Sequence, residues 1–102
     1  MARIIYSLSA LASLERLTNF LYDENPIEAA KTVNLITEAL QILENHPLMG
    51  RPAEQGLREL VISRGKSGYL ALYSYEHRQD MILILAVRHQ REAGYMEEIG
   101  HY

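Results

Sequence analysis

The sequence predicts an α+β domain in which a strand and an antiparallel helical hairpin precede a three-stranded antiparallel meander, a β-α-α-β-β-β order. Two patterns support this prediction. In the first half, apolar residues recur every three or four positions, which is the period of a helix with one buried face. In the second half, apolar runs are separated by short turn sequences, which is typical of a meander. A chain of 102 residues corresponds to one domain, residues 1–102.

The first half of the chain contains the predicted strand and the helical hairpin. Residues 3–7 are rich in β-branched side chains and are predicted as a strand. The first helix begins near Leu8, with Ser7 or Ser9 as its N-cap. A break at residues 23–26 ends it, and Asn25 followed by Pro26 is typical of the start of a second helix. We expect this second helix to run to about residue 45 and to end before a proline.

The second half reads as a loop followed by the meander. Gly and Pro mark residues 48–56 as a loop. The three predicted strands cover residues 57–64, 69–76 and 81–88, with turns at 65–68 and 77–80. The third strand is apolar on both faces, so we place it inside the sheet. The tail, residues 92–102, is expected either to be flexible or to dock on a partner.

Regular hairpins at both turns would determine which side chains share a face. Arg64 would lie opposite Tyr69, and Tyr69 opposite Arg88. One face would carry Leu60, Ile62, Ala71, Tyr73, Ile82, Ile84 and Ala86. The other face would carry Val61, Leu70, Leu72, Leu83, Leu85 and Val87. Two helices cover one face, so we expect a partner protein on the second; the alternative is closure by the tail and the first strand's flanks.

The same register gathers positive charge at one end of the sheet. Residues 57–91 contain six Arg or Lys against three Asp or Glu, although the whole chain carries a net charge of −3. The basic corner consists of Arg64, Lys66, Arg88, His89 and Arg91. It predicts an anion-binding or partner-binding surface, and a solvated sheet rim is the alternative.

Several classes of protein and site are excluded or disfavoured. The chain has no cysteine, which excludes disulfides and thiolate chemistry. The longest apolar run, Met81–Val87, is too short for a membrane span, and no signal peptide is recognised. We therefore expect a cytoplasmic protein that does not associate with membranes. No phosphate-binding loop is present, and the four histidines lack paired metal spacing, so we expect neither cofactor nor metal.

The sequence from Arg88 to Arg91, together with Tyr95, is the strongest candidate for chemistry. Arginine, histidine and tyrosine at a sheet end can orient a phosphodiester and move a proton on RNA without a metal ion. Arginine at a strand end also serves ordinary solvation or salt bridging.

Four segments carry a family resemblance. They are residues 46–52 (HPLMGRP), 57–62 (LRELVI), 68–73 (GYLALY) and 84–95 (ILAVRHQREAGY). In these segments and in element order, the chain resembles the RelE/ParE superfamily of bacterial toxins. The resemblance implies the toxin of a type II toxin–antitoxin, or plasmid stabilisation, module. It also implies a cognate ParD-like antitoxin that wraps the toxin, neutralises it and forms a hetero-oligomer with it.

The branch of the superfamily depends on a basic residue set. RelE-like members, which cut messenger RNA on the ribosome, typically place cations where this chain has Val61, Ser63, Leu70 and His89; only Tyr95 matches their pattern outright. ParE-like members lack that set and are associated with DNA gyrase poisoning through protein–protein contact. The chain is more similar to ParE, which implies a non-enzymatic gyrase inhibitor without sequence-specific DNA binding. A RelE-like nuclease and a non-toxic binding module remain the alternatives.

The resemblance and the predicted register together imply two surfaces. The target-binding residues would be Arg64, Lys66, Tyr69, Arg88, His89, Arg91 and Tyr95. In the nuclease alternative, the catalytic residues would be Arg64, Lys66, Arg88, His89 and Tyr95. The antitoxin would bind the apolar sheet face at Val61, Leu70, Leu72, Leu83 and Leu85.

Overall fold

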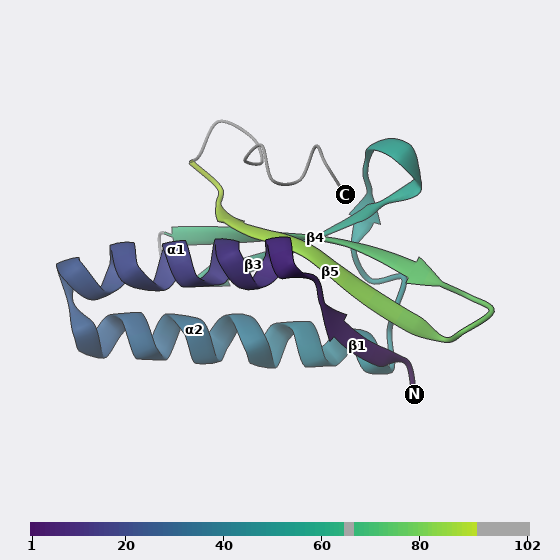
Figure 1. Ribbon diagram of the computed structural model, residues 1–102, viewed down its shortest axis with the longest axis horizontal. Coiled ribbons are helices and arrows are strands. Elements are labelled where there is room, and N and C mark those ends of the chain that lie inside the picture. Colours follow the sequence, from purple (N-terminus) through teal and green to yellow (C-terminus); the bar gives the residue numbers. More distant parts are fainter. Residues whose placement is uncertain (65–66, 92–102) are drawn as a thin grey trace.

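The computed structural model describes residues 1–64 and 67–91, and it forms a single sheet backed by a helical hairpin (Figure 1). In chain order the elements are β1 (Arg3–Tyr6), α1 (Leu8–Glu24), α2 (Pro26–Gln41), η1 (Ile42–Glu44), β2 (Arg51–Pro52), η2 (Glu54–Gly56), β3 (Arg58–Arg64), β4 (Ser67–Glu76) and β5 (Met81–His89). The strand order is β1-β5-β4-β3-β2. This arrangement confirms the predicted α+β class and the interior position of the last strand.

Local capping signals determine where the two helices begin. The Ser7 hydroxyl accepts a hydrogen bond from the Ala10 amide at 3.0 Å. The Asn25 side chain accepts from the amides of Ile27 and Glu28 at 3.1 and 3.3 Å. These bonds satisfy amides that a helix start leaves without partners. Helix α2 ends at Gln41, earlier than predicted, because the chain tightens into the 3₁₀ turn η1 before reaching Pro47.

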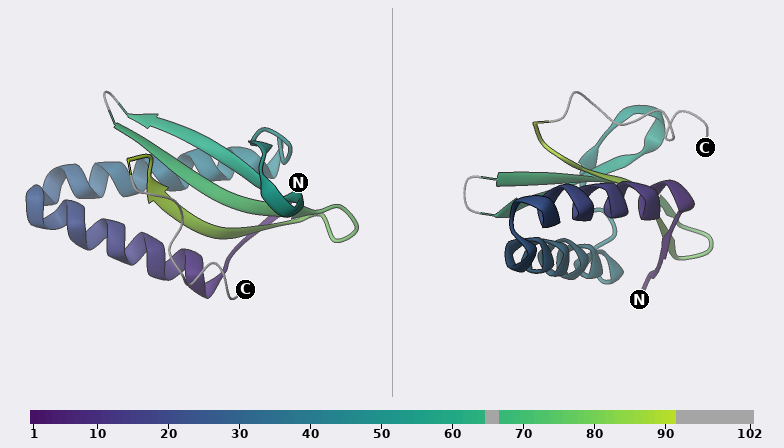
Figure 2. Two further views of the ribbon diagram at one scale, coloured as in Figure 1. Left: turned by 90° about the horizontal axis from the view of Figure 1, so that it is seen from above. Right: turned by 60° about the vertical axis from the view of Figure 1, so that its left-hand side comes forward.

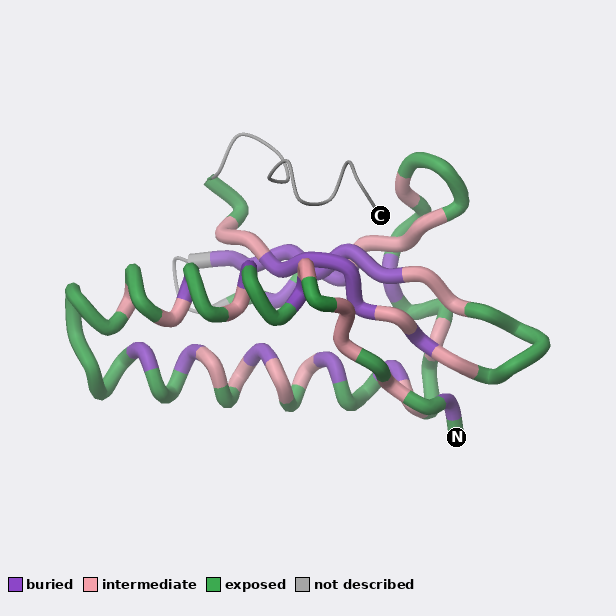
Figure 3. The backbone as a smooth tube through the Cα atoms, in the orientation of Figure 1, coloured by how far each residue is buried: buried purple, intermediate pink, exposed green. Residues whose placement is uncertain are grey.

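The main core lies between the helical hairpin and one face of the sheet (Figures 2 and 3). Helix α1 packs along β5, and α2 packs against α1 and β3. The largest fully buried side chains are Tyr73, Ile36, Leu40, Leu43, Ile82, Ile84 and Val87. Strand β1 pairs with β5 in parallel, and the connection between these two neighbouring strands contains the helical hairpin and the strands β2, β3 and β4.

The first hairpin differs from the predicted register by two residues. Arg64 pairs with Ser67, and Ile62 pairs with Tyr69, whereas the sequence placed Arg64 opposite Tyr69. The strands continue closer to the turn than the two glycines had indicated. A two-residue shift leaves each side chain on its predicted face.

The second hairpin follows the predicted register only near its turn. Tyr73 pairs with Ile84 as expected, but Leu72 pairs with Ala86, so Leu85 is an extra residue in β5. This β-bulge reverses the facing of every later β5 residue. Val87 therefore joins the core on the helix side, and Ala86 lies on the other face. The prediction had these two residues exchanged and was wrong for that reason.

The second face of the sheet is partly covered by the chain itself. The segment containing β2 and η2 folds over the side opposite the helices (Figure 1). Its Ala53 and Leu57, like Leu83 of β5, pack against a buried cluster formed by Leu72, Leu85 and Ala86. The sequence had indicated only a loop there, because β2 has just two residues and no strand pattern. The expectation of a fully open apolar face is therefore corrected.

Two strand side chains hold the loop that leads into β2. The buried Tyr73 hydroxyl accepts from the Gly50 amide at 2.9 Å and donates to the Pro47 carbonyl at 2.8 Å. The Arg58 guanidinium donates to the carbonyls of Leu48 and Gly50 at 3.2 and 2.6 Å. A Cβ on Gly50 would lie 2.7 Å from the Tyr73 ring and hydroxyl, so only glycine allows this approach. Burial raises the pKa of Tyr73, although the bond from Gly50 and the charge of Arg58 oppose that effect.

We predict that Tyr73→Phe lowers the free energy of unfolding by about 1–3 kcal/mol, because the buried loop groups lose their partner. Urea unfolding followed by circular dichroism measures this change. The matched control is Tyr75→Phe, whose hydroxyl bonds to Asp80 at an exposed site and which should change stability by less than about 0.5 kcal/mol. Equal losses in the two variants would contradict the role assigned to Tyr73.

Candidate functional site

The basic corner lies where β3 ends, β4 begins and β5 ends. Ile62 pairs with Tyr69, Tyr69 pairs with His89, and the Gln90 amide donates to the Gly68 carbonyl at 2.9 Å. The three strand ends therefore meet as the sequence predicted. Arg64 ends β3 and Arg91 lies just past β5. Lys66 of the predicted corner and Tyr95 of the predicted target-binding set lie outside the described residues.

The β5 bulge divides the corner between the two faces of the sheet. Tyr69 and His89 lie on the helix side, with ring centroids 5.3 Å apart in an edge-to-face arrangement. Arg88 lies on the opposite face, in a row with Leu70 and Val61. The prediction of Tyr69 and Arg88 on one face is therefore wrong. The guanidinium of Arg88 and the imidazole of His89 therefore lie on opposite faces of the sheet, and the Tyr69 beside His89 is only 3% exposed.

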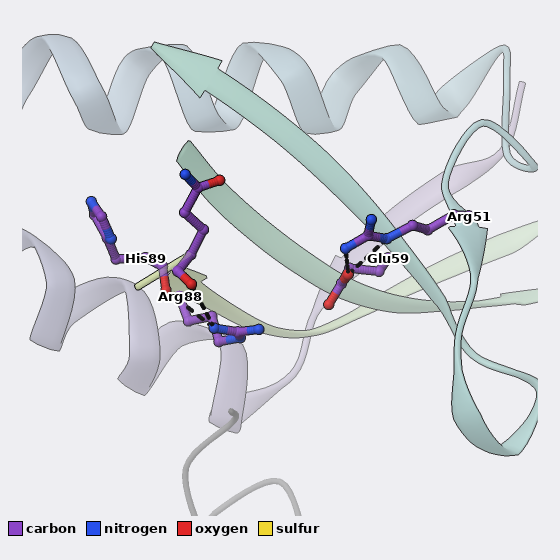
Figure 4. A network of polar contacts seen from close by, with 5 residues as sticks. Arg51, Glu59, Arg88 and His89 are labelled. Atoms are coloured by element: carbon purple, nitrogen blue, oxygen red, sulfur yellow. Dashed lines mark hydrogen bonds and ion pairs between the residues drawn. The ribbon is translucent and has the colours of Figure 1, made fainter. Parts of the chain in front are cut away.

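The Arg88 side chain turns back over the end of its own strand (Figure 4). Its Nη1 atom donates to the His89 carbonyl at 3.3 Å and to the Gln90 carbonyl at 3.5 Å. The side chain is half-buried. These bonds keep the guanidinium charge at the sheet end, where it can attract an anion or an acidic protein surface.

The ring of His89 points away from the Arg88 guanidinium (Figure 4). Its Nδ1 atom accepts a hydrogen bond from the Arg91 amide at 3.0 Å. From this bond we assign the ring proton of the neutral imidazole to Nε2, because an accepting Nδ1 carries a lone pair. His89 therefore has an N–H donor at Nε2 that its contact with Arg91 does not use.

A second polar pair fastens β2 to β3. The Arg51 guanidinium binds the Glu59 carboxylate through Nη2 at 2.5 Å and Nε at 3.0 Å (Figure 4). The Glu59 side chain is only 12% exposed, whereas that of Arg51 is 62% exposed. The ion pair thus holds the covering segment on the second face. Sequence reasoning missed it, because nothing in the spacing of these two residues indicates that they pair.

The apolar residues predicted to bind an antitoxin differ in accessibility. Val61 is 47% exposed, whereas Leu70, Leu72 and Leu85 are at most 6% exposed. Leu83 is half-buried against the covering segment. A partner that approaches this face therefore meets Val61 at its surface.

Other kinds of site find little support in the described part of the chain. Residues 1–64 and 67–91 contain no group of three His, Cys, Asp or Glu side chains that could hold a metal ion. Their helices are too short or too polar to cross a membrane. At the far end of the sheet, the hydrogen bond from Tyr75 to Asp80 raises the pKa of the Tyr75 hydroxyl.

Comparison with known proteins gives consistent results. Residues 4–94 match the family described as the ParE toxin of the type II toxin–antitoxin system parDE. Toxin RelE3 of Caulobacter vibrioides is 31% identical over 83 residues, covering 81% of this chain and 88% of the relative. The chromosomal ParDE system from P. aeruginosa contains a chain with a TM-score of 0.73 and 25% identity, with 87% of this chain and 96% of that chain covered.

A second solved structure agrees in fold. The toxin–antitoxin complex RelBE2 from Mycobacterium tuberculosis contains a chain with a TM-score of 0.58 and 24% identity, covering 87% of this chain and 98% of that one. The family match extends over nearly the whole chain and includes every strand of the sheet. The chain therefore belongs to the ParE toxin family of type II toxin–antitoxin systems, within the RelE/ParE superfamily.

Proposed function

We propose that this toxin arrests bacterial growth by inhibiting DNA gyrase through protein–protein contact, and that a ParD-like antitoxin neutralises it. The family match and the similarity to a ParDE toxin support the proposal. The observation that carries it is the character of Val61, Ser63 and Leu70 on β3 and β4. These side chains cannot neutralise a phosphate, as a metal-independent nuclease requires. The proposed action is cytoplasmic and needs no cofactor.

The basic corner is the proposed target-contacting surface. The proposed surface adds Tyr69 and Tyr95 to the corner residues Arg64, Lys66, Arg88, His89 and Arg91. Charged residues at the rim of an interface steer association and fix orientation, so the corner suits an acidic surface on the target. In this proposal the toxin reads no DNA sequence itself.

The antitoxin is proposed to bind the second face of the sheet as part of a hetero-oligomer. The residues involved would be Val61, Leu70, Leu72, Leu83 and Leu85. Val61 is the most accessible of these residues, at 47% exposed. Since Val61, Leu70 and Arg88 form one row across three strands, an antitoxin seated on Val61 would also lie beside the basic corner. Neutralisation would then follow from blocking access to the target-contacting surface.

A RelE-like messenger RNA endonuclease is the second candidate. The pair of Tyr69 and His89 favours it, because the His89 imidazole lies edge-to-face with the Tyr69 phenol ring and carries an Nε2 proton that its bond from the Arg91 amide does not use. Such groups can transfer protons and stabilise charge on a phosphodiester. The similarity to Toxin RelE3 is compatible with either branch of the superfamily.

We predict that the purified toxin inhibits supercoiling by DNA gyrase or traps cleaved DNA, and that adding the antitoxin restores supercoiling. A gel-based supercoiling assay measures this activity. The control is topoisomerase I, whose relaxation of the same plasmid should be unaffected. Unchanged gyrase together with codon-specific messenger RNA cleavage would support the nuclease instead. Normal growth at verified expression would leave the non-toxic binding module.

We predict that Arg88→Ala raises the inducer concentration needed for growth arrest at least about tenfold, because an arginine at an interface often contributes more than about 1 kcal/mol to the binding free energy. Circular dichroism should show an unchanged fold. Arg78→Ala is the matched control, since Arg78 is exposed in the turn at the opposite end of the sheet. Undiminished growth arrest by Arg88→Ala would show that the corner does not contact the target.

We predict that Val61→Asp raises the dissociation constant of the antitoxin about tenfold or more, because a buried carboxylate without a partner is unfavourable. Isothermal titration calorimetry measures the constant. Ile27→Asp is the control, because Ile27 is 69% exposed on α2 rather than on the sheet. If both variants bind equally well, the antitoxin occupies a different surface.

A further inference from the structure

Helix α1 takes the place of a strand along the second half of β5. Strand β1 ends at Tyr6, which pairs with Ile84, whereas β5 continues to His89. The Ser7 amide donates to the Ile84 carbonyl at 2.9 Å, and the Ser7 hydroxyl donates to the Leu85 carbonyl at 3.4 Å. Beyond Leu85, the described edge of β5 faces α1 rather than another strand. Its backbone groups need partners from the helix.

Ser13 on α1 supplies one of these partners. Its hydroxyl accepts a hydrogen bond from the Val87 amide at 3.0 Å and donates to the Ala10 carbonyl at 3.0 Å. Ser13 is 2% exposed and Val87 is 1% exposed. Both atoms are therefore shielded from water, and the Val87 amide would lack this acceptor without the hydroxyl. A buried amide left unsatisfied is strongly unfavourable.

The bulge that orients the basic corner lies on the same stretch of β5. Leu85 is the extra residue, and Val87 follows two positions later. The bulge places Arg88 on the open face and His89 beside Tyr69. Without it, regular pairing would exchange Arg88 and His89 between faces. The bond from Val87 to Ser13 is made in the bulged register, in which Val87 faces the helices.

We propose that Ser13 is a positioning residue for the target-contacting corner. Its hydroxyl holds Val87 against α1 and thereby keeps β5 in the bulged register, which determines the faces of Arg88 and His89. This inference rests on the proposed function only in assigning the corner to the target. Ser13 lies on α1, outside the strand ends that form the corner, so it acts through β5 and not by contact with the target.

The test compares Ser13→Ala with a variant that destabilises a distant part of the core. Ile36→Val removes one methyl from a fully buried residue of α2 and serves as the matched control. The measurements are hydrogen exchange at the Val87 amide, the NMR signals of the His89 ring, and the inducer needed for growth arrest. If Ser13→Ala does not fold, Ser13→Cys has a similar shape with a weaker acceptor and allows the same comparison.

For Ser13→Ala we expect about tenfold faster Val87 exchange relative to the rest of β5, because the amide loses its acceptor. We also expect shifted His89 ring signals and weaker growth arrest. Ile36→Val should leave the His89 signals unchanged. The double variant Arg88→Ala, His89→Ala already lacks the side chains that Ser13 positions. In this background, adding Ser13→Ala should weaken growth arrest no further than adding Ile36→Val does.

Unchanged His89 signals in Ser13→Ala would overturn the proposal. Equal effects of Ser13→Ala and Ile36→Val on His89 and on growth arrest would overturn it as well, because they would show a merely structural role. A wild-type toxin that arrests growth without inhibiting gyrase would overturn the proposed target alone. The His89 signals and the growth arrest report on the corner whatever the target is, so the two failures are distinguishable.

Discussion

The contact between α1 and the edge of β5 is the constraint on which the rest of the structure depends. The hydroxyls of Ser7 and Ser13 bond the β5 backbone at Leu85 and Val87, where a neighbouring strand would otherwise be needed. This contact orients the helical layer over the sheet. It also accommodates the bulge, which separates Arg88 from His89. Polar groups at the start and side of α1 thus pair with backbone groups at the edge of β5. The domain is too small to surround both elements with further structure.

Other polar contacts hold the loop before β2 and the segment that covers the opposite face of the sheet. Tyr73 reaches from the core to bond the loop at Pro47 and Gly50, and Arg51 with Glu59 fastens β2 at the sheet edge. The covering segment then shields the leucine cluster with Ala53 and Leu57. Val61, in the middle of β3, is 47% exposed and lies beyond that cover. One face of the sheet therefore forms the main core with the helices, and the other is an apolar face that the chain covers in part.

Sequence reasoning succeeded where the signal is local. Each helix has an apolar stripe along the chain and a capping residue directly before its first turn. The capping roles of Ser7 and Asn25 are confirmed. The corner was found because Arg88 and His89 directly follow the apolar run Met81–Val87. The division of the corner between the two faces was not predicted, because it depends on the bulge in β5. The bulge is accompanied by a hydrogen bond between Ser13 and Val87, which are 74 positions apart, so no local pattern indicates it. The two-residue β2 and its ion pair with β3 likewise depend on tertiary contacts that have no periodic pattern.

The parallel pairing of the first and last strands has a consequence for synthesis of the toxin. Residues in and next to β1 form hydrogen bonds with residues of β5 that lie about 78 positions later in the chain. One example is the bond between Ser7 and Leu85. While the ribosome is still making β5, the helical hairpin has emerged but its sheet is incomplete. The corner formed by the end of β5 cannot assemble until almost the whole described chain has left the exit tunnel. A nascent fragment of this toxin would therefore lack the basic corner until the end of β5 has been made and has paired with β4.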